Sequence, residues 1–82
     1  MYRETTLTVS DKRRDRHDLD VEILPDDGRG YDAIVRIEND GRSYEFGVFE
    51  NSQGRIADKL TSGDVPAWGE NALRQLGLEG LA

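Results

Sequence analysis

The tetrapeptide Asn39-Asp40-Gly41-Arg42 is the feature that most restricts how this chain can fold. An Asp-Gly pair supplies the two positive φ angles of a type I′ turn, which joins two antiparallel strands through a two-residue loop. A loop at Asp40 and Gly41 places Asn39 opposite Arg42 and thereby fixes the pairing of both flanking segments. The sequence therefore predicts a β-hairpin in one register.

The residues that this register brings together match on both faces of the hairpin. One face pairs apolar residues only: Ile37 with Tyr44, Val35 with Phe46, and Ala33 with Val48. On the other face Arg36 lies opposite Glu45, an opposite-charge pair that contributes about 0.2–1 kcal/mol. A slip of one residue would destroy both matches, so the two faces favour the same register.

Two further segments show the alternation of half-buried strands. Residues 2–9 are rich in β-branched side chains, and residues 19–24 alternate apolar with acidic ones. Between them residues 10–18 contain no apolar side chain before the second strand, which predicts a solvated charged loop. Residues 25–30 combine proline, aspartate and glycine, which predicts a turn before the strand at 31–38.

The C-terminal third has helical spacing. Ile56 and Leu60 lie four residues apart and predict a short helical turn at 55–60. Asp64 is suited to cap a helix over residues 65–76, and one apolar stripe runs along that helix: Val65, Trp68, Ala72, Leu73 and Leu76. Gly77 is suited to end it as the residue of positive φ, with Leu78 as the hydrophobic follower.

These elements predict an α+β fold, a four-stranded antiparallel β-meander packed on one face by a C-terminal α-helix. The chain has 82 residues, no cysteine and no internal repeat, which indicates one small domain over residues 1–82 stabilised by apolar packing alone. The N-terminus resembles no signal peptide, and no stretch reaches the roughly 20 apolar residues of a membrane helix. We therefore expect a cytoplasmic protein that does not enter the membrane.

The sequence contains few residues suited to catalysis. His17 is the only histidine, so one chain cannot assemble a Ser-His-Asp triad or a two-histidine metal site. A lone histidine in a charged loop is usually solvated, and the alternative is that Asp15 or Asp18 tunes it. No motif for a cofactor is present, and a core of this size is too small to enclose a substrate pocket. We expect no enzyme, no cofactor and no metal.

The aromatic residues divide between the two sheet faces. Tyr31, Tyr44, Phe46 and Trp68 are predicted in the core. Phe49 falls on the outer face, diagonal to Ile34, and Leu24 extends this apolar patch. The patch predicts a protein-binding or homodimer surface on the outer sheet face. The alternative is that Leu78 or Leu81 of the C-terminal tail covers it.

A basic cluster interrupts an otherwise acidic chain. Lysine and arginine number 11 against 17 acidic residues, a net charge of −6, yet Lys12, Arg13, Arg14 and Arg16 surround a single aspartate. The overall charge disfavours nucleic acid as a partner. The loop itself is suited to grip phosphates or acidic protein surfaces, since guanidinium groups pair with both oxyanions.

We therefore expect a small, non-catalytic interaction or regulatory protein that binds a macromolecular partner, with inhibition as one form of that role. Among partners, another protein is favoured. The first alternative is a nucleic-acid-binding module that uses the basic loop at 12–16. The second is an acidic mimic of nucleic acid, of the kind found among phage anti-restriction and anti-CRISPR proteins, an analogy of size and charge only.

Overall fold

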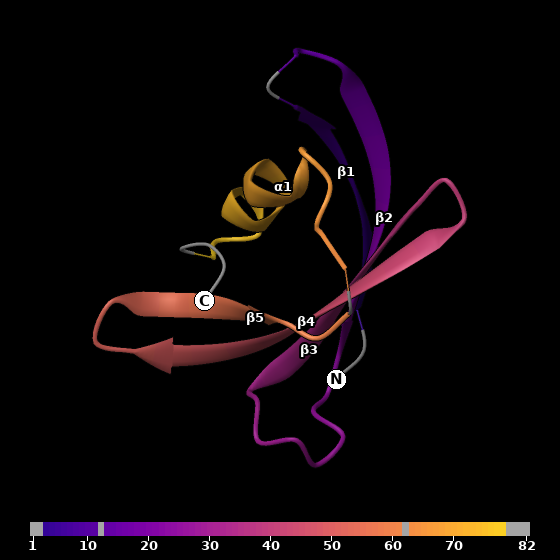
Figure 1. Cartoon of the computed structure of the whole chain (residues 1–82). Helices are drawn as coiled ribbons and strands as arrows, with labels where there is room; N and C mark the ends of the chain where they lie inside the picture. Colours follow the sequence, from indigo (N-terminus) through magenta and orange to yellow (C-terminus); the bar gives the residue numbers. More distant parts are fainter. Residues whose placement is uncertain (1–2, 12, 62, 79–82) are drawn as a thin grey trace.

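The computed structural model describes residues 3–11, 13–61 and 63–78. Five antiparallel strands lie side by side in chain order: β1 (Arg3–Ser10), β2 (Arg16–Leu24), β3 (Ala33–Asn39), β4 (Arg42–Asn51) and β5 (Gly54–Lys59). One helix, α1 (Gly69–Gln75), follows them. The sheet curls into a half-barrel, and α1 lies on its concave side, between the β1–β2 and β4–β5 hairpins (Figure 1).

The β3–β4 hairpin has the predicted register. Asn39 pairs with Arg42, and all three predicted apolar pairs are present. Asp40 and Gly41 have φ angles of 51° and 76°, as a type I′ turn requires. On the outer face Nη2 of Arg36 lies 3.3 Å from Oε2 of Glu45. The prediction is confirmed for both faces.

A fifth strand replaces the helical turn predicted at 55–60, so the strand count of four was wrong. A spacing of four residues also fits one face of a strand, because four is a multiple of its two-residue period. Ile56 pairs with Phe49 in the sheet, and the N–H of Leu60 donates to the carbonyl oxygen of Glu45 at 2.9 Å. Ala57, between them, is fully buried and supplies the core contact of β5.

The charged loop predicted at 10–18 is shorter in the structure, because β1 and β2 extend into it from both sides. Their pairing runs to Ser10 opposite Arg16, which leaves only residues 11–15 as the loop. Polar side chains support this extension, since Oγ1 of Thr8 donates to Oδ1 of Asp18 at 2.9 Å. Beyond the end of β3 the two strands continue as a ribbon that α1 supports from the concave side (Figure 1).

The helix is shorter than predicted at its beginning and ends where expected. It begins after Trp68, without a side-chain cap, rather than at the predicted cap Asp64. Residues 66–69 form a turn instead, in which the N–H of Gly69 donates to Pro66 at 2.9 Å and Val65 lies where a side chain on Gly69 would be. At the other end Gly77 has φ 82°, and Leu78 donates to Leu73 at 2.9 Å, which completes a Schellman motif.

The core fills the concave side of the sheet. Its buried apolar side chains come from all five strands, from α1 and from Leu78, and Trp68 and Phe46 are its largest fully buried members. The ring of Tyr44 meets that of Trp68 edge to face, with centroids 5.5 Å apart. Asn71 and Gln75 of α1 donate to backbone carbonyls of β1, those of Ser10 and Thr8. The helix is thus attached to the sheet by apolar packing and by its amide side chains.

Tyr31 lies on the outer face, contrary to the predicted core position. It precedes β3, which begins at Ala33, so the alternation of the strand does not extend to it. Its ring lies over Gly47, with its centroid 6.4 Å from that of Phe49, and its hydroxyl donates to Oδ2 of Asp58 at 2.6 Å. This hydrogen bond to a carboxylate raises the pKa of Tyr31 above its ordinary value.

Replacing Gly47 by alanine tests this arrangement. A Cβ at this position would lie 2.6 Å from atoms of the Tyr31 ring, so the ring must move or the strands must separate. We expect the free energy of unfolding, measured with urea, to fall by about 1–3 kcal/mol. The same change in a Tyr31→Ala background should cost much less. Equal losses in both backgrounds would contradict the placement of the ring.

Candidate functional site

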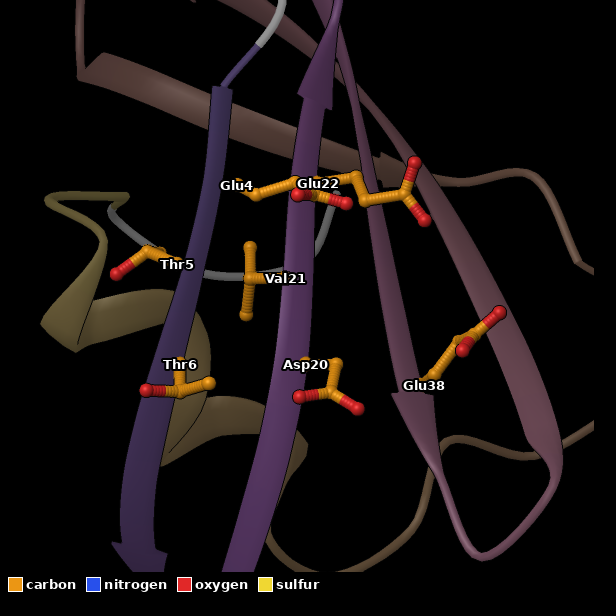
Figure 2. A pocket seen from close by; sticks show the side chains of 7 residues that line it. All are labelled: Glu4, Thr5, Thr6, Asp20, Val21, Glu22 and Glu38. Atoms are coloured by element: carbon orange, nitrogen blue, oxygen red, sulfur yellow. The ribbon is translucent and has the colours of Figure 1, made fainter.

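Carboxylates gather on the outer face of β1, β2 and β3. The register places them on alternate residues of the three strands: Glu4, Asp18, Asp20, Glu22 and Glu38. Most of them line a shallow depression of about 490 Å³, and Figure 2 shows their side chains over β1, β2 and β3. We call these five residues the acidic face.

Like charges stand directly opposite each other on the acidic face. Glu4 pairs with Glu22 across β1 and β2, and Asp20 pairs with Glu38 across β2 and β3. Like charges in such positions destabilise a sheet, because their Cβ atoms are only about 5 Å apart. Arg36 offsets part of this repulsion, since its Nη1 lies 3.8 Å from Oε2 of Glu22.

The apolar part of the outer face lies further along, over β3, β4 and β5. Ile34, predicted as an exposed binding residue, is only 2% exposed and therefore offers little surface. Phe49 is half-buried, with Tyr31 beside it and Ile56 opposite it. Leu78 does not cover this patch, because it is buried in the core on the other side of the sheet, and Leu81 lies outside the described residues.

The basic loop is ordered by one carboxylate. Oδ1 of Asp11 accepts hydrogen bonds from the N–H groups of Arg13 at 2.8 Å and Asp15 at 3.1 Å. Arg14 adopts φ 66°, a left-handed conformation that favours glycine or asparagine. Arg13, Arg14 and Arg16 are exposed and form no ion pair with any described residue. Lys12 lies outside the described residues.

The other oxygen of Asp11 binds His17. Its Oδ2 lies 2.9 Å from Nε2 of His17, and only 9% of the aspartate side chain and 27% of the histidine side chain are exposed. The hydrogen bond from His17, together with the two loop N–H groups, lowers the pKa of Asp11 despite partial desolvation. The sequence suggested Asp15 or Asp18 as the partner of His17, which was wrong. The available signal was an aspartate at the first position of a hairpin loop, where it typically bonds to the backbone two residues on.

A hollow of about 470 Å³ opens beside this Asp11–His17 pair. It lies where the β1–β2 loop, the β3–β4 turn and the segment before α1 meet. Its lining residues include two acidic ones, Asp11 and Asp40, the basic Arg42, and the ring-bearing His17, Tyr44, Pro66 and Trp68. Sequence reasoning did not find this hollow, because its residues come from three separate segments of the chain.

Within the turn predicted at 25–30, the side chain of Asp26 binds the backbone. The carboxylate of Asp26 accepts from the N–H groups of Gly28, Arg29 and Gly30 at 2.9–3.3 Å. Partial desolvation acts to raise the pKa of Asp26, and these backbone hydrogen bonds outweigh it, so that pKa is lowered. Within the described ranges no group of three acidic or histidine side chains is arranged to hold a metal ion.

Comparison of the chain with protein-family models, with curated proteins and with solved structures finds no match. Among the described residues, no helix is long and apolar enough to cross a membrane.

Replacing Asp11 by asparagine tests the role of its carboxylate. A carboxylate with a lowered pKa in the folded state stabilises the fold above its unfolded pKa of about 3.9, and this contribution is lost as the pH falls through the folded pKa. Asparagine cannot supply it. We expect the variant to unfold at lower urea concentration than the parent at pH 7, and the difference to shrink between about pH 4 and pH 2. Asp15→Asn, which removes the same charge from the same loop, should show a smaller effect, and equal effects would contradict the assignment.

Proposed function

We propose that the protein is a non-catalytic binding module whose acidic face docks on a basic surface of another protein. The observation that carries the proposal is the pair Asp20 and Glu38, two carboxylates opposite each other on neighbouring strands. An arrangement that opposes folding and leaves the charges open to solvent is typical of a surface that serves binding. A partner with positive charge opposite these carboxylates relieves their mutual repulsion on binding. This favours the correct partner and speeds association.

The spacing of the carboxylates suits arginine and lysine side chains. Asp18, Asp20 and Glu22 alternate along β2, so they lie about 7 Å apart on one face. Neighbouring strands add further carboxylates at about 5 Å to each side. Such an array presents many oxygens to guanidinium groups, which bind carboxylates in pairs of hydrogen bonds. Proteins that bind nucleic acids carry basic surfaces, so an acidic mimic that blocks one of them is a specific form of this proposal.

The apolar patch further along the same outer face belongs to the proposed docking surface. Phe49 and Ile56 pair across β4 and β5 on the same outer face, and neither is fully buried. Interfaces commonly combine an apolar centre with a charged rim that sets orientation. We therefore expect the partner to carry an apolar residue next to its basic groups.

Replacing Glu38 by lysine separates binding from stability. The variant places a lysine opposite Asp20, so the free energy of unfolding should rise by about 0.5–1 kcal/mol while binding is lost. The tagged parent and variant would be compared by capture from nuclease-treated host lysate, with quantitative mass spectrometry of the eluates. A protein that the parent retains and the variant loses at least tenfold is the expected result.

Asp64→Lys is the matched control for that experiment. It changes the net charge equally at an exposed position before α1, away from the acidic face. We expect it to retain the same captured protein as the parent. If both lysine variants lost the partner to the same extent, net charge alone would explain the result and the acidic face would have no specific role.

A nucleic-acid interface at the basic loop is the second candidate. The observation that favours it is the ordered loop itself, in which Asp11 holds the backbone while Arg13 and Arg14 stay exposed without an ion pair to the described residues. A loop that is already ordered loses little entropy on binding phosphates. The acidic face on the adjoining strands opposes this function, which is why it ranks second.

The double variant Arg13→Glu, Arg14→Glu tests the second candidate. If the loop grips phosphates, the parent should bind single- or double-stranded oligonucleotides with an affinity that falls steeply as salt is added, and the variant should bind at least tenfold more weakly. Fluorescence anisotropy over a salt series measures both. Equal affinities of parent and variant would exclude the loop as a nucleic-acid interface.

A further inference from the structure

We propose that the hollow beside His17 binds a small molecule that carries an oxyanion, a carboxylate or a phosphate, on an apolar ring. The inference is independent of the docking function of the acidic face. It rests on three residues that line one hollow: His17, Arg42 and Tyr44. The Arg42 guanidinium and the Tyr44 hydroxyl can each donate a hydrogen bond to an oxyanion. His17, whose Nε2 is bound to Asp11, can donate through Nδ1 when both ring nitrogens carry a proton.

Two of these residues, Arg42 and Tyr44, have a donor without a partner in the described part of the chain. Arg42 forms no ion pair there, whereas Arg29, Arg36 and Arg55 each contact a carboxylate. The Tyr44 hydroxyl has no hydrogen-bond partner among residues 3–11, 13–61 and 63–78, although its ring is fixed against Trp68. Arg13, Arg14 and Arg16 also form no ion pair with the described residues, but Arg42 is the arginine that lines the hollow, so its guanidinium is free to bind a ligand there.

His17 is oriented for this role by Asp11. The hydrogen bond between Nε2 and Oδ2 of Asp11 leaves Nδ1 without a partner among the described residues. Oδ1 of Asp11 is bound to two loop N–H groups, so the aspartate is itself held in place. An imidazole backed by a fixed carboxylate is a common way to position a histidine toward a ligand.

The apolar wall of the hollow favours a ligand whose oxyanion is attached to an apolar ring. Pro66 and Tyr44 are half-buried, and the buried Trp68 lies behind them. The volume of about 470 Å³ falls within the range of small-molecule sites. A ring against this wall would bring an attached oxyanion toward Arg42 and His17.

The test is a titration of the isotope-labelled full-length protein, followed by NMR, with phenyl phosphate, benzoate and inorganic phosphate. We expect millimolar binding of at least one aryl oxyanion, with shift changes at His17, Arg42 and Tyr44. Phenyl phosphate and benzoate distinguish a phosphate ligand from a carboxylate ligand. Binding of inorganic phosphate as tight as that of both aryl compounds would overturn the role of the apolar wall.

Three variants decide whether the hollow is the site. Arg42→Gln should weaken binding roughly tenfold or more, and Tyr44→Phe, which keeps the ring and its packing, should weaken it several-fold. Arg74→Gln removes the same charge from an exposed position on α1 outside the hollow and should leave the affinity unchanged. Equal weakening by Arg74→Gln and Arg42→Gln, shift changes confined to the loop at residues 13–16, or no shift change at all would overturn the proposal.

Discussion

The β3–β4 turn is the constraint on which the other features depend. Because Asp40 and Gly41 both take positive φ angles, the two strands meet in one register, and every side chain on them is assigned to a face. The neighbouring strands continue this assignment across the sheet. Apolar residues then lie on the concave side around Trp68, and the carboxylates lie outside. Core and acidic face are two results of one register.

The same turn also shapes the end of the molecule. Arg42 directly follows it, and Tyr44 lies two residues further on the same face, so both border the hollow beside His17. The β1–β2 ribbon reaches past the end of β3 and brings Asp11 and His17 to the same place. A surface for a basic partner and a hollow for an oxyanion can therefore coexist in a small domain, because they occupy different sides of it.

The sequence predicted those parts of the fold that local chemistry determines. The Asp-Gly turn and the glycine at the end of α1 have the geometry that their residue types favour. The predictions were wrong where one spacing of apolar residues fits both a helix and a strand, or where contacts come from distant segments of the chain. Ile56 and Leu60 satisfied both helix and strand spacing, and only pairing with β4 decides between them. The core is too small to enclose a pocket, whereas the hollow forms outside it, between loops that meet only in the folded chain.

The attachment of α1 to β1 has a consequence for synthesis of the chain. Asn71 and Gln75 bond to carbonyls 61 and 67 positions earlier, and Leu78 fills part of the core. The first strand thus completes its contacts only after α1 has been synthesised, and contacts of such long separation form late in folding. Until α1 and Leu78 pack against the sheet, its concave face exposes apolar side chains. A net charge of −6 opposes the association of such partly covered chains, because molecules of like charge repel each other.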